Sequence, residues 1–144
     1  MLCPLSYGGP FHHDTCLKRR ISKSAGWVMA GAFNETKGTE LASDVGLARS
    51  MWARFWGLIG RRSLPVRHGL LISPCSSVHT FFMRFPIDVI FISRSGRVVK
   101  IVPAMKPWRT ALGGSGAHSA LELNAGEASA GSLEVGDVLR LPER

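Results

Sequence analysis

The sequence predicts a mainly β domain, bordering on α+β, of about six antiparallel strands in a sandwich or small barrel, with one amphipathic helix packed outside. Residues 75–102 hold short apolar runs that alternate or are rich in β-branched residues, and Gly and Pro separate these runs. Only residues 48–59 combine a clear helical spacing with a long apolar side. A chain of 144 residues, 45% of them hydrophobic, is long enough to bury one core.

The chain is expected to divide into an N-terminal extension, residues 1–44, and a single compact domain, residues 45–144. The first 44 residues are rich in Gly, Pro, Ser and Thr without a sustained hydrophobic period, which predicts a poorly ordered segment. Within residues 18–32 a basic cluster precedes an apolar stretch, the order of a secretory signal, although it lies far from Met1. A cytoplasmic protein is expected, or an exported one if residues 18–32 act as a signal.

Residues 48–59 predict the helix. Arg49 and Arg54 fall on its polar side, and Gly60 with Pro65 ends it. A broad apolar stripe usually covers a sheet, although Trp and Phe beside arginines also fit a membrane interface. The apolar side consists of Ala48, Met51, Trp52, Phe55, Trp56 and Ile59.

The strands are predicted from residue 69 onward. Residues 77–84 alternate between two faces, whereas residues 87–93 are almost continuously apolar, as in a strand covered on both sides. Ser93-Arg94-Ser95-Gly96 predicts a hairpin turn, and one helical turn is expected within residues 125–133. The predicted strands are residues 69–73, 77–84, 87–93, 97–102, 120–123 and 138–141.

Several spaced motifs resemble those of a known family. They are Gly69-Leu70-Leu71, His79-Thr80-Phe81-Phe82-Met83, Pro86-Ile87-Asp88-Val89-Ile90-Phe91-Ile92 and Leu121-Glu122-Leu123-x-Ala125-Gly126. In this order, over about residues 48–141, they are similar to the bacterial and archaeal family called domain of unknown function 192. The resemblance implies a compact mainly β domain and brings no established activity. The chain differs from the commoner pattern at Phe82 and Arg84, where many members have Trp and Lys.

Asp88 is the most informative candidate site residue. It lies within an apolar run, and burial of a carboxylate costs several kcal/mol unless the group is paired or hydrogen-bonded. Arg84 and His79 precede it closely enough to be partners across the Pro86 break, and backbone N–H groups are the structural alternative. An arginine oriented by Asp88 would suit an anion.

These residue types favour a non-enzymatic binding module for a small anionic ligand, with its site at the open end of the β core. Arginine and histidine would supply positive charge, and Trp108 would supply a stacking face. We expect no metal and no cofactor. The predicted ligand-binding residues are His79, Arg84, Asp88, Trp108, Arg109 and His118.

A hydrolase is one alternative. Cys75 and His79 are four residues apart, a spacing that fits a thiolate–imidazolium pair or, with His118 as a third ligand, a zinc site. The three cysteines form no C-x-x-C pair, so reduced thiols are the simpler interpretation.

A peripheral nucleic-acid or membrane-surface binder is the second alternative. The net charge is +8, and residues 46–109 hold 11 of the 18 basic residues with a single acid, Asp88. Arg61, Arg62 and Arg67 would contribute to such a surface. An arginine-rich composition explains the same charge, so these partners are less favoured than a small ligand. The sequence contains no apolar run long enough to cross a bilayer.

Overall fold

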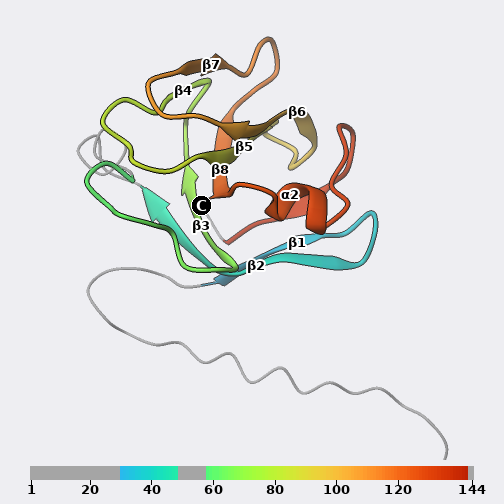
Figure 1. Cartoon of the computed structure of the whole chain (residues 1–144). Helices are drawn as coiled ribbons and strands as arrows, with labels where there is room; N and C mark the ends of the chain where they lie inside the picture. Colours follow the sequence, from blue (N-terminus) through green and yellow to red (C-terminus); the bar gives the residue numbers. More distant parts are fainter. Residues whose placement is uncertain (1–29, 49–57, 143–144) are drawn as a thin grey trace, which may run out of the picture.

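The computed structural model describes residues 30–48 and 58–142 (Figure 1). The predicted helix over residues 48–59 lies mostly outside the described residues, as do residues 1–29 of the predicted extension over residues 1–44. Among the residues that are described, no helix is long and apolar enough to cross a membrane.

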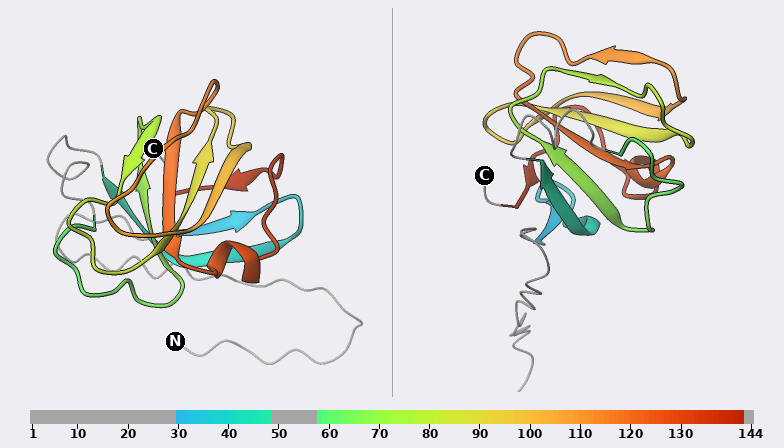
Figure 2. Two further views of the ribbon diagram at one scale, coloured as in Figure 1. Left: turned by 45° about the horizontal axis from the view of Figure 1, so that its top comes forward. Right: turned by 90° about the vertical axis from the view of Figure 1, so that its left-hand side faces the viewer.

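The predicted mainly β class is confirmed. One sheet curls into a half-barrel, a two-stranded ribbon lies over it, and a single short helix is present among the described residues (Figures 1 and 2). The sheet has the strand order β6-β5-β8-β3-β2-β1-β9, and the ribbon pairs β4 with β7. The elements are β1 Ala30–Asn34, β2 Thr39–Ala48, β3 His68–Ile72, β4 Ser77–His79, β5 Ile87–Ile92, β6 Val98–Met105, β7 Thr110–Leu112, β8 Ser119–Asn124, α2 Glu127–Ala130 and β9 Leu139–Arg140.

The curl brings the two ends of the sheet together. Arg97, just before β6, forms an isolated antiparallel bridge with Val138, just before β9. Two backbone hydrogen bonds flank this bridge, from Val98 N to the Asp137 carbonyl (2.8 Å) and from Leu139 N to the Gly96 carbonyl (2.9 Å). The exposed edges of an open sheet are therefore partly closed at this point.

One strand pairing differs from the prediction that all neighbours are antiparallel. β2 and β3 run parallel, with Asp44 opposite His68 and Ala48 opposite Ile72. Parallel neighbours need a long connection, and residues 49–67 supply one.

The expected boundary at residue 45 does not mark the start of the sheet. β1 and most of β2 precede it, and they pair with each other and with β9. Small buried side chains such as Ala32 and Ala42 carry the packing here. Alanine and glycine leave a weak hydrophobic pattern, which explains why residues 30–44 resemble an extension in sequence.

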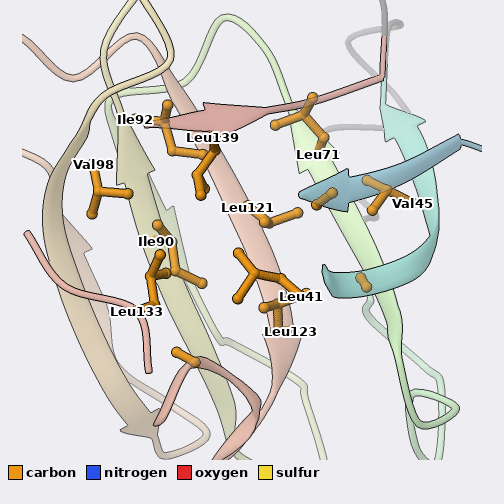
Figure 3. Close-up of a cluster of buried hydrophobic side chains, with 13 residues drawn as sticks. Leu41, Val45, Leu71, Ile90, Ile92, Val98, Leu121, Leu123, Leu133 and Leu139 are labelled. Carbon is orange, nitrogen blue, oxygen red and sulfur yellow. The ribbon is translucent and has the colours of Figure 1, made fainter. Parts of the chain in front are cut away.

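Two apolar clusters cover the two faces of the sheet. Leu121 and Leu123 of β8 point into the first, inside the half-barrel (Figure 3). Ala120 of β8 points to the opposite face, into the second cluster, which also contains Val78 of β4 and Met83. The second cluster therefore holds the β4–β7 ribbon and the loop that follows β4 against the sheet.

The predicted strand over residues 77–84 is wrong beyond His79, where β4 ends. Thr80 turns into the interior, and Phe82 has a positive φ of 63°, a conformation outside the β region. The other predicted strands agree with β3, β5, β6, β8 and β9 to within a few residues, and α2 lies within the expected helical turn.

Substitution of Leu121 by Ala tests the inner cluster. Leu121 is fully buried, so the change should lower the free energy of unfolding by about 2–5 kcal/mol. Leu112→Ala is the matched control, because Leu112 is 67% exposed and should change stability by less than about 0.5 kcal/mol. Urea unfolding measures both, and equal losses would contradict this placement of the core.

Candidate functional site

Thr80 joins two loops at one end of the β4–β7 ribbon. Its side chain is fully buried, and its Oγ1 donates to the Lys106 carbonyl (2.8 Å) and accepts from Arg109 N (3.0 Å). Its backbone N donates to the Arg109 carbonyl (2.9 Å), and its carbonyl accepts from Trp108 N (3.0 Å). The loop after β4 and the loop before β7 are therefore held as one unit.

Three aromatic side chains on these loops form an exposed cluster, which we call the aromatic platform: Phe81, Phe82 and Trp108. They are 38%, 65% and 55% exposed. The ring centroid of Trp108 lies 4.8 Å from that of Phe82, edge to face, and 6.0 Å from that of Phe81. His79 stacks on Phe81 at 5.3 Å. The rings fix one another's orientation while leaving apolar surface open to solvent.

The backbone of the platform is strained. Phe82 and Trp108 both have φ of 63°, in the left-handed region that bulky residues avoid. Such a conformation costs of order 1–3 kcal/mol at each position and persists only where surrounding contacts impose it. The Thr80 carbonyl supplies that constraint, because it accepts from Trp108 N (3.0 Å) and from Met83 N (3.3 Å), and the second bond closes the turn that contains Phe82. Strain of this kind is concentrated in proteins at binding and catalytic sites.

Three exposed cations lie beside the platform in the chain, and we call them the basic flank: Arg84, Lys106 and Arg109. None forms an ion pair with another residue in the part of the chain that the structure describes; the ion pairs found there involve Lys37, Arg67, His68 and Arg140. Asp88, the single acid between residues 46 and 109, is fully buried. No acidic residue near the basic flank in the sequence therefore lies at the surface, where it could neutralise the positive charge.

Asp88 is satisfied by backbone amides, which was the structural alternative. Its Oδ1 accepts from Ala104 N (2.8 Å), and its Oδ2 accepts from Gly126 N (2.9 Å) and Ala128 N (3.0 Å). It alternates along β5 with residues of the second cluster, so it faces the half-barrel interior, away from the ribbon. The expected orientation of Arg84 by Asp88 is therefore not found, and Asp88 instead fastens β6 and α2 to β5.

The remaining predicted site residues are divided between the two ends of the ribbon. His79 lies opposite Thr110 in the ribbon and joins the platform. His118 lies beyond the other end, where its carbonyl accepts from Cys75 N (2.7 Å). The zinc site with Cys75, His79 and His118 therefore finds no support, and no three His, Cys, Asp or Glu side chains among residues 30–48 and 58–142 are grouped to hold a metal ion.

Glu122 is a buried carboxyl that the sequence does not predict as a site residue. It lies at the centre of the sheet, opposite Leu70 of β3 and Val89 of β5, and is 4% exposed. Its side chain makes no hydrogen bond or ion pair with any other described residue. Burial raises its pKa to about 8, so the carboxyl is mainly neutral at pH 7. An acidic residue in a strand that is covered on both faces has no solvent-exposed side to occupy. The only sequence signal for the burial of Glu122 is its position between the apolar residues Leu121 and Leu123.

Fold and site together define a small curled-sheet β domain that carries an exposed, strained aromatic platform with a basic flank. The chain belongs to the family DUF192, described as "Uncharacterized ACR", whose model matches residues 32–141. The match begins within β1, further toward the N-terminus than the resemblance at about residue 48.

Relatives of the same family are found in archaea. A UPF0127 protein of Pyrococcus furiosus is 37% identical over 111 residues, covering 74% of this chain and 93% of the relative. A UPF0127 protein of Thermococcus sibiricus is 34% identical over 110 residues, covering 72% of this chain and 70% of the relative.

Two solved structures share the fold. One is a crystal structure titled a putative transcription regulator from Sinorhizobium meliloti, with a TM-score of 0.70 at 23% identity over 82% of this chain and 97% of that one. The other, a protein of unknown function from Novosphingobium aromaticivorans, has a TM-score of 0.64 at 21% identity over 83% of this chain and 99% of that one.

Asp88→Asn separates a structural role from a ligand-binding one. An amide replaces one accepting oxygen with a donor that faces backbone N–H groups, so the free energy of unfolding should fall by about 1–3 kcal/mol. Glu134→Gln, at a side chain that is 75% exposed, is the control and should change stability little. Urea unfolding measures both. Wild-type stability of Asp88→Asn would contradict the structural role.

Glu122→Gln tests the buried carboxyl. The folded-state pKa of about 8 lies above the ordinary value of 4.5, so the folded wild type binds the extra proton and loses stability as pH rises between these values. The Gln variant cannot ionise at this position. It should therefore become more stable relative to wild type as pH increases from about 5 to 8. Urea unfolding over this range measures the difference, and parallel pH profiles would refute a raised pKa.

Proposed function

We propose that this protein is a non-enzymatic binding module for a small anionic ligand, and that the aromatic platform and the basic flank form its binding surface. The single observation that carries this proposal is the Phe82–Trp108 pair. Both rings are more than half exposed and both sit on left-handed backbone. Exposed large rings and left-handed backbone both lower the stability of the free protein, so their presence together indicates a binding surface.

The basic flank supplies the preference for an anion. Arg84 and Arg109 carry planar guanidinium groups that donate paired hydrogen bonds to carboxylate or phosphate oxygens. Lys106 adds a third positive charge, close in sequence to Trp108. Because these cations have no ion-pair partner among the described side chains, they need not break an existing pair before they bind a ligand.

The platform supplies contact area. Burying apolar surface contributes about 25 cal/mol for each Å², and a preformed platform loses little conformational entropy when it binds. His79 contributes to the orientation of Phe81 through ring stacking. Asp88 and His118 are not needed for this binding surface, because one is satisfied by backbone amides and the other lies at the far end of the ribbon.

Arg84→Ala and Arg109→Ala test the proposal. Wild-type protein should be stabilised against heat by at least one anion from a panel of phosphate, sulfate, citrate and adenosine monophosphate, since a ligand that binds the folded state raises Tm. Each substitution should reduce that shift and weaken binding about tenfold in calorimetry, consistent with loss of one charge-assisted hydrogen bond.

Arg94→Ala is the matched control, because Arg94 is exposed on the hairpin between β5 and β6, at the opposite end of β5 from Arg84. It should leave the shift unchanged. If no anion in the panel stabilises the wild type, or if the control weakens binding as much as the two test variants do, the proposed binding surface is wrong.

A further inference from the structure

We infer, resting on the proposed function, that the ligand of this surface is a nucleotide unit, whose base stacks on the aromatic platform while its phosphate is bound by the basic flank. The decisive juxtaposition is of exposed rings and exposed cations on two loops that Thr80 ties together. A ligand that contacted only the aromatic platform would leave the basic flank without a role, and a ligand that contacted only the basic flank would leave the aromatic platform without one.

A simple inorganic anion would leave the platform unused. Phosphate or sulfate is recognised by guanidinium and amide donors and has no apolar face to offer. Phe82 and Trp108 would then remain exposed, and their strained backbone would have no role in binding. A purely apolar ligand would leave the basic flank unused and would bury its charges at a cost.

A planar ring linked to a phosphate uses both halves. Base stacking on aromatic side chains is worth about 1–3 kcal/mol for each base and tolerates any base identity. Trp108 keeps 55% of its surface exposed after contact with Phe81 and Phe82, so ring surface remains available. The guanidinium group of the neighbouring Arg109 can donate hydrogen bonds to the phosphate oxygens, as arginine commonly does.

The rigidity of the surface favours a stacked base over a membrane. Lipid insertion asks only that apolar side chains be exposed, and it sets no requirement on ring orientation. Here the Oγ1 and backbone groups of Thr80 fix the backbone at Trp108, and the edge-to-face contact at 4.8 Å fixes the ring of Phe82 relative to Trp108. Preorganised geometry of this kind matches a ligand of defined shape.

Calorimetry on the full chain with adenosine monophosphate, inorganic phosphate and adenosine tests the inference. Adenosine monophosphate should bind more tightly than phosphate or adenosine. Trp108→Leu should weaken its binding about tenfold or more while leaving phosphate binding unchanged, because only the stacking contribution is lost. Trp108→Phe keeps a ring and should retain most of the affinity. A cooperative thermal unfolding transition checks that each variant is folded before its binding is compared.

A short oligothymidylate distinguishes the source of the nucleotide. Tighter binding of the oligonucleotide than of the mononucleotide, falling steeply with salt, identifies a single strand, and equal binding identifies a free nucleotide. Either result supports the inference.

Other outcomes overturn it. If phosphate binds as tightly as adenosine monophosphate and Trp108→Leu changes neither affinity, the proposed anion site stands and the nucleotide inference fails. If neither ligand binds, the nucleotide inference fails, and the proposed anion site fails with it if sulfate and citrate do not bind either. Binding to vesicles of phosphatidylserine and phosphatidylcholine that requires Trp108, without nucleotide binding, identifies a membrane surface instead.

Discussion

The hydrogen bonds of Thr80 are the constraint on which the candidate site depends. A hydroxyl and a peptide unit in the interior connect two loops that share no strand pairing beyond the short β4–β7 ribbon. They hold the chain at Trp108 itself and at Lys106 and Arg109 on either side of it, which constrains Trp108 to its left-handed backbone. The buried hydrogen bonds of Thr80 therefore hold the two loops in the conformation that exposes the rings of the aromatic platform. A buried network of this kind is stable only when every member is satisfied.

Two buried acids on adjacent strands illustrate opposite solutions to one electrostatic problem. Asp88 accepts three backbone hydrogen bonds, one from β6 and two from amides at the start of α2, and these bonds compensate its burial. Glu122 has no such partner among the described residues, and burial raises its pKa to about 8. The first acid holds the fold together, and the second lowers the stability of the fold as pH rises from about 4.5 to about 8.

Much of the fold could be predicted from the sequence, because β-branched runs such as Ile87–Ile92 carry a strong local signal. β1 and β2 could not, since alanine and glycine pack there through small size and not through hydrophobic pattern. Of the proposed binding surface, the residue types alone point to Trp108, Arg84 and Arg109. The alternating pattern instead places Phe81 and Phe82 in a strand, since it does not reveal that Thr80 draws the chain out of β geometry. His118 and His79 lie at opposite ends of the ribbon because of how β4 and β7 pair, and residue spacing along the chain does not predict that pairing.

The most direct test of the central claim is to map by NMR where adenosine monophosphate contacts the full-length protein. The account predicts that the largest chemical-shift changes occur at the Trp108 indole and at the backbone amides of Phe81, Phe82 and Arg109, with little change near Cys75 or within β1. Changes centred elsewhere, for example around Glu122 or at the far end of the ribbon near His118, would contradict it.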